Sequence, residues 1–94
     1  MIFEATFKGI QERPSKHGGI FYYMFFTNEN GESMRVNAYP KLRNFKNWRP
    51  FLTMTRGAKI GGLKKLKGYD NLIDGNSQPI VLKEVKINQL EIKL

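Results

Sequence analysis

The segment Ile20–Thr27 places five aromatic rings within six consecutive positions, from Phe21 to Phe26. Aromatic side chains favour strands, and a strand points alternate side chains to opposite faces of its sheet. Rings must therefore lie on both faces of this strand. One face can contribute to a hydrophobic core, and the rings on the other face need a second use.

A hairpin signal follows this segment. Asn30 and Gly31 form the dipeptide typical of a two-residue type I′ turn, in which both central residues need a positive φ. With these residues as the turn, Tyr22 lies opposite Tyr39. A longer turn would shift the pairing by one residue and exchange the two faces of one strand.

The type I′ register predicts one apolar face and one mixed face on the hairpin. The apolar face, which we expect to be core, carries Phe21, Tyr23, Phe25, Met34, Val36 and Ala38. The mixed face carries Tyr22, Met24, Phe26, Arg35, Asn37 and Tyr39. Because arginine and asparagine are costly to bury without partners, we expect the mixed face to point outward.

The rest of the chain adds three further strands and one helix. Alternating apolar residues predict a first strand over residues 2–11, and a polar loop with proline and glycine joins it to the aromatic segment. Pro40 and Pro50 bracket a short predicted helix. Strand-like segments follow at 55–68 and 80–87, separated by a polar loop, and residues 88–94 keep the alternation.

Three strands, a helix and two strands in this order predict an all-β OB-fold, a small five-stranded barrel with one short helix between the third and fourth strands. An SH3-like barrel is the alternative, and the position of the helix favours the OB order. We expect residues 1–94 to form a single OB-fold domain in which residues 87–94 are a strand-like C-terminal tail.

The charge of the chain indicates an anionic partner. The sequence has 16 Lys and Arg residues against 8 Asp and Glu residues, for a net charge of +8. A small domain this basic typically binds a polyanion, and nucleic acid is the first candidate. An anionic membrane surface or simple solubility are the alternatives. With no cysteine, one histidine and no catalytic motif, we expect no enzymatic activity, no cofactor and no metal.

Residues 3–67 resemble, in pattern, the single-stranded DNA-binding proteins of bacterial and phage type, which are OB-folds. Three pieces carry the resemblance: FKGIQERPSKHGG, the strand SMRVNAY with Arg35 and Tyr39, and the turn LTMTRGAKIGG after the helix. The sequence departs from the family at Ser33, where a tryptophan is usual. It also ends in LEIKL, so we do not expect recruitment of partners through the acidic C-terminal tip of the family.

The outward rings are then expected to stack on unpaired bases, a sequence-tolerant contact worth about 1–3 kcal/mol per base. Alternatively, they pack against the helix, the tail or a second subunit. OB-folds bind oligonucleotides on strands two and three and on the flanking loops. The predicted nucleic-acid-binding residues are Tyr22, Met24, Phe26, Arg35, Asn37, Tyr39, Arg13, Lys16, Lys59, Lys64, Lys65, Lys67 and Tyr69.

The expected function is sequence-tolerant binding of single-stranded DNA in replication, recombination or repair, with RNA as an open alternative. A second class of function is a small accessory subunit that docks onto a polymerase, primase or helicase through the alternating tail. A homo-oligomer is also open. We expect a cytoplasmic protein without a membrane partner, because no apolar run could span a bilayer and the first residues lack a secretory signal.

Overall fold

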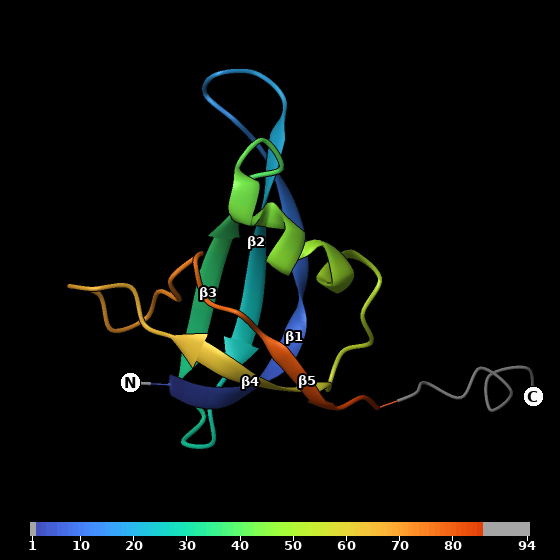
Figure 1. Ribbon diagram of the computed structural model, residues 1–94, viewed down its shortest axis with the longest axis vertical. Helices are drawn as coiled ribbons and strands as arrows, with labels where there is room; N and C mark the ends of the chain where they lie inside the picture. Colours follow the sequence, from blue (N-terminus) through green and yellow to red (C-terminus); the bar gives the residue numbers. More distant parts are fainter. Residues whose placement is uncertain (1, 86–94) are drawn as a thin grey trace, which may run out of the picture.

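The computed structural model describes residues 2–85, in which five antiparallel strands make up one sheet (Figure 1). The strands are β1 (Ile2–Pro14), β2 (Ile20–Thr27), β3 (Ser33–Ala38), β4 (Lys59–Lys64) and β5 (Ile80–Lys83). They lie in the order β3-β2-β1-β4-β5. The predicted all-β class is confirmed. Residues 86–94, which include the end of the last predicted strand and the tail, lie outside the described residues.

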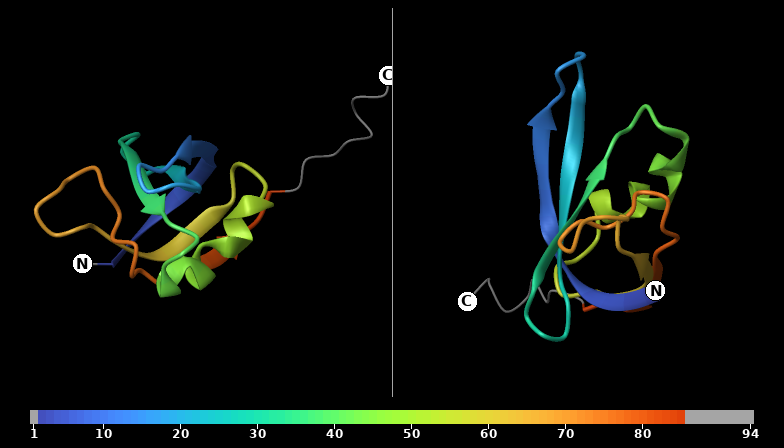
Figure 2. Two further views of the ribbon diagram at one scale, coloured as in Figure 1. Left: turned by 90° about the horizontal axis from the view of Figure 1, so that it is seen from above. Right: turned by 90° about the vertical axis from the view of Figure 1, so that its left-hand side faces the viewer.

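β1 is long enough to pair with two neighbours. Its first half pairs with β4 and its second half with β2, and the second ladder changes register at a bulge between Phe7 and Gly9. Gly9 has a φ of 130°, which glycine adopts without the steric penalty of a side chain. Bulges bend a strand and increase its twist, and β1 curves from one ladder into the other (Figure 2). The curled sheet is compatible with an OB-like architecture, and β3 and β5 are its two outer strands.

The predicted helix is present as two short 3₁₀ segments. These are η1 (Arg43–Asn47) and η2 (Arg49–Leu52). An α-helix running through Pro50 would lose one hydrogen bond, and the proline ring would clash with the carbonyl of Lys46. The prediction was therefore right that a helical segment lies between β3 and β4. It was wrong about a single regular helix that ends at Pro50, because η2 includes Pro50 and continues to Leu52.

The helical segments cover the inner face of the sheet with aromatic side chains. The buried rings of η1, η2 and the residue between them are Phe45, Trp48 and Phe51. Phe51 lies edge-on to Phe7 and Phe26, with ring centroids 5.3 and 5.6 Å apart. Trp48 Nε1 donates to the carbonyl of Gly75 at 2.8 Å, so the buried indole has a partner for its only donor. This aromatic packing holds segments that are too short to be stable as isolated helices.

The β2–β3 turn is a three-residue loop. Asn28 donates its backbone N–H to the carbonyl of Glu32 at 3.0 Å, and Gly31 donates to the carbonyl of Asn28 at 2.9 Å. Gly31 has a φ of 82°, and no residue other than glycine in the described part of the chain has a positive φ. A type I turn that ends in a left-handed residue is typical of three-residue hairpin loops. The predicted type I′ turn is wrong, because Asn30 would also need a positive φ.

The longer loop shifts the register by one residue and exchanges the faces of β2. Tyr22 pairs with Ala38 rather than with Tyr39. Met24 is 0% exposed and Phe26 is 1% exposed, so the prediction that they point outward is wrong. The β2 rings expected in the core instead lie on the outward face; these are Phe21, Tyr23 and Phe25. β3 keeps its predicted core residues, which are Met34, Val36 and Ala38.

Asn28 should contribute more to the stability of this turn than Asn30. Asn28 Oδ1 accepts the backbone N–H groups of Asn30 at 3.0 Å and Glu32 at 2.9 Å, and Asn28 Nδ2 donates to the Glu32 carboxylate at 2.7 Å. Hydrogen bonds of this kind contribute about 0.5–1.5 kcal/mol each. We expect Asn28→Ala to lower the free energy of unfolding in urea by about 1–2 kcal/mol in total.

Asn30→Ala is the matched control. Its side chain makes none of these three hydrogen bonds, so we expect a change within about 0.5 kcal/mol, as for an ordinary surface substitution. A larger loss for Asn30→Ala than for Asn28→Ala would contradict the three-residue loop, because it would indicate that Asn30 holds a special backbone conformation.

Candidate nucleic-acid interface

Four aromatic rings contact one another in sequence across the outward face of β2 and the end of β3. We call them the aromatic row, and they are Tyr39, Phe21, Tyr23 and Phe25. Phe21 stacks on Tyr39 with centroids 4.9 Å apart and planes at 16°. Tyr23 lies edge-on to Phe21 at 5.4 Å and to Phe25 at 6.1 Å. β2 supplies three members because every second residue of a strand faces the same side.

Two arginines flank the middle of the aromatic row. The Cζ atom of Arg35 lies 4.2 Å from the centre of the Tyr23 ring, and that of Arg13 lies 5.2 Å from it. The two come from β3 and β1, the strands on either side of β2. Arg35 Nε also donates to Asn37 Oδ1 at 3.0 Å. Each guanidinium carries five N–H donors, so it can contact the ring and still offer donors to a phosphate.

The loop between β4 and β5 runs beside β3. Arg35 donates its backbone N–H to the carbonyl of Asn71 at 3.1 Å, and its own carbonyl accepts the N–H of Ile73 at 2.7 Å. The contact is a short parallel bridge. Tyr69 is exposed in this loop. Lys16 lies in the β1–β2 loop, which projects from the end of the β1–β2 hairpin (Figure 2).

Three of the predicted binding residues face the core. Phe26 lies edge-on to Trp48 with centroids 6.3 Å apart, Met24 is buried, and Tyr22 stacks on Phe45 at 6.2 Å with planes at 28°. Rings on this face of β2 therefore pack against the helical segments, which was the alternative that the sequence left open. The outward face holds four other predicted residues: Arg13, Arg35, Asn37 and Tyr39.

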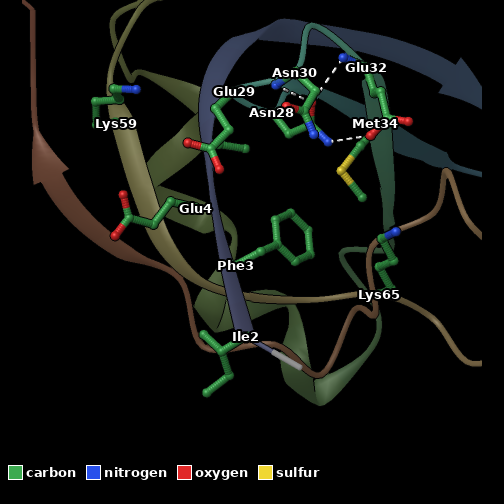
Figure 3. A pocket seen from close by; sticks show the side chains of 11 residues that line it. Ile2, Phe3, Glu4, Asn28, Glu29, Asn30, Glu32, Met34, Lys59 and Lys65 are labelled. Carbon is green, nitrogen blue, oxygen red and sulfur yellow. Dashed lines mark hydrogen bonds between the residues drawn. The ribbon is translucent and has the colours of Figure 1, made fainter.

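The predicted lysines do not form one uniform positive track. Lys59 and Lys65 line a groove of about 770 Å³ near the β2–β3 turn, together with three glutamates, Glu4, Glu29 and Glu32. Figure 3 shows Phe3 and Met34 pointing toward each other inside this groove. Carboxylates on the same walls repel phosphate, so the groove is a poor site for a nucleic-acid backbone. Lys64 and Lys67 are exposed outside it.

The sequence analysis placed the three β2 members of the aromatic row in the core and did not predict that they lie on the outward face. The available signal was the spacing of Asn28 and Glu32 around a loop that ends in Gly31, which favours a three-residue turn. None of the helical segments within residues 2–85 is long and apolar enough to cross a membrane.

No protein-family model, curated protein or solved structure matches this chain.

Proposed function

We propose that the protein binds single-stranded DNA without strong sequence preference, on the outward face of β1, β2 and β3. The observation that carries the proposal is the aromatic row with arginines on both sides of Tyr23. Unpaired bases stack on aromatic rings at about 1–3 kcal/mol each, and every base has a face that can do so. Arginine adds stacking and phosphate contacts to the same surface.

Packing in the hydrophobic core does not explain why the aromatic row lies on the outward face. The inner face is filled by rings from β1, β2 and the helical segments, including Phe7, Phe26, Trp48 and Phe51. The aromatic row lies on the opposite face of β2, and one of its members, Tyr39, is 37% exposed. Apolar side chains that cluster on a surface mark binding sites more often than isolated ones do.

Charge and fold support the same substrate. The net charge of +8 favours a polyanion. The curled five-stranded sheet is compatible with the OB-fold, which binds oligonucleotides on its second and third strands. The pattern resemblance to single-stranded DNA-binding proteins points to replication, recombination or repair as the setting. RNA is the competing ligand, because stacking does not depend on the sugar.

Equilibrium binding to an oligo-dT of about 30 nucleotides, longer than one OB-fold site, tests the proposal across a salt series. We expect single-stranded DNA to compete better than a duplex of the same length, and affinity to fall with salt. The slope should be about −0.7 per phosphate contact. Oligo-rU in the same competition separates RNA from DNA. Absent affinity, or affinity that does not change with salt, would contradict the proposal.

Arg13→Gln should reduce the magnitude of the salt slope by about 0.7, because one phosphate contact is lost. Arg43→Gln is the matched control: it removes the same charge from an exposed position on η1, outside the proposed interface. Equal slopes for the two variants would mean that binding follows the net charge of the protein and not the proposed face.

A second candidate function is that of an accessory subunit docked onto a replication protein. β5 favours it, because its three apolar side chains, Ile80, Val81 and Leu82, are all exposed in the described structure. An apolar outer strand can pair with a strand of a partner. If the titrations detect no affinity for single strands, docking through β5 becomes the first candidate.

A further inference from the structure

A small notch lies beyond the end of the aromatic row. It has a volume of about 290 Å³, and it is formed where the β1–β2 loop faces the segment that follows β3. The loop side contributes Ser15, His17 and Ile20, and the other side contributes Tyr39, Lys41 and Leu42. Figure 1 shows the loop at the top of the molecule and the segment after β3 below it, and both line the notch.

The walls of the notch are apolar and exposed. Ile20 is 41% exposed, Leu42 is 53% exposed, and Tyr39 stands beside them at the surface. Three large apolar side chains thus converge on one concavity that the described part of the chain leaves open to solvent. A small number of polar groups accompanies them at the same site, namely His17 and Lys41. Apolar walls with a few polar groups are typical of ligand pockets.

Backbone hydrogen bonds fix both walls. On the loop side, Ser15 donates to the carbonyl of Gly19 at 3.0 Å, and Gly18 donates to the carbonyl of Ser15 at 3.2 Å. On the other side, Leu42 donates to the carbonyl of Tyr39 at 2.9 Å. The notch is therefore a formed feature of the surface, as ligand pockets usually are.

Tyr39 connects the notch with the aromatic row. Its ring stacks on Phe21 and also lines the notch. A strand whose bases stack along Phe25, Tyr23 and Phe21 would reach the notch with its next base. The volume is slightly below the range of about 300–1,000 Å³ for drug-sized ligands, which suits a single flat ring system.

We propose that this notch holds one unpaired nucleobase at the end of the bound strand, between Leu42 and Ile20, with Lys41 and His17 beside the adjoining phosphate. The inference rests on the proposed single-strand binding and adds a defined terminal subsite to it. The positive charge of Lys41 at the rim is complementary to a phosphate, and the apolar walls can pack against the faces of a base. The aromatic row supplies a continuous path to the site.

An abasic-site scan tests the proposal. Oligo-dT ligands just long enough to fill one site, about 4–16 nucleotides for one OB-fold, are used so that the strand cannot shift its register without losing contacts. Each carries one abasic position, which is moved along the strand, and is titrated against the wild type and against Leu42→Ala. We expect Leu42→Ala to weaken binding of the intact oligonucleotide by about 5-fold or more, as for partial loss of one stacked base. When the abasic position falls in the notch, the variant and the wild type should bind equally, because the two changes remove the same contact.

Two further variants make the outcome decisive. Ile20→Ala, in the opposite wall, should reproduce the loss and its disappearance at the same abasic position. Ile2→Ala removes an apolar side chain that is even more exposed, at 64%, and lies outside the notch, and it should bind every ligand like the wild type. Circular dichroism and urea unfolding check that each variant is folded.

The scan separates failure of the notch from failure of the proposed function. If Leu42→Ala binds the intact oligonucleotide normally while Tyr23→Ala weakens it, the row binds bases and the notch does not. If Leu42→Ala weakens intact and abasic ligands equally at every position, its effect is not contact with a base. If the wild type binds no single strand at all, the proposed function itself is wrong.

Discussion

Replacement of Phe26 with alanine is expected to lower the free energy of unfolding by about 3–5 kcal/mol, as for other buried aromatic side chains. Phe26 is 1% exposed. Its ring lies 5.6 Å from those of Phe7 and Phe51 and 6.3 Å from that of Trp48. Truncation would leave a cavity among rings from β1, η2 and the residue before it, and close-packed neighbours refill such a space only in part. Domains have a total stability of about 5–15 kcal/mol, so the variant should be close to unfolding.

Phe25→Ala is the matched control, because it removes the same side chain one position earlier on the same strand. Phe25 lies on the outward face, where its ring contacts that of Tyr23 at 6.1 Å. We expect a loss of about 1 kcal/mol or less. Urea unfolding followed by circular dichroism measures both. The opposite order of effects would support the register that Asn30 and Gly31 predict and would place Phe25 in the core.

The sequence was sufficient to predict β3 and its two faces. Its apolar residues, among them Met34 and Val36, alternate strictly with Arg35 and Asn37. Burial of arginine and asparagine without partners is unfavourable, so only one orientation of the strand puts apolar side chains inside. The structure has that orientation: Met34 and Val36 are buried, and Arg35 and Asn37 lie on the other face.

β2 could not be oriented in the same way. Both of its faces carry rings, so a shift of one residue costs little in apolar burial and the pattern does not select a register. The choice then depends on the turn, and the side chain of Asn28 decides it through hydrogen bonds that a dipeptide signal does not reveal. The predicted assignment of faces was consequently right for β3 and wrong for β2.

The positions of the lysines were beyond prediction for a different reason. Lys59 and Lys65 are on the same segment of sequence, but their surroundings depend on how the sheet curls. The curl brings Glu29, from the β2–β3 turn, to the same groove. Local charge in the sequence therefore gives the net attraction for a polyanion but not the path of a bound strand.

Tyr23→Ala should weaken binding of single-stranded DNA by about 1–3 kcal/mol, the value of one base stack, with little change in the unfolding transition. Tyr23 is the most connected ring of the aromatic row, because it contacts Phe21 and Phe25 and lies under two arginines. Its loss removes a stacking surface and also the ring against which Arg35 is positioned. Fluorescence anisotropy with a labelled oligo-dT measures the affinity, and Tyr23→Phe should retain most of it.

Tyr22→Ala gives the opposite expectation with the same chemical change at the neighbouring position. Tyr22 faces the core and stacks on Phe45 of η1, so its removal should lower stability while the folded fraction keeps its affinity for DNA. The pair separates contact with bases from support of the fold. If neither tyrosine affects affinity, the aromatic row does not bind bases. Its rings would then be best explained as a contact surface for a protein, and docking onto a replication partner would replace single-strand binding as the first candidate function.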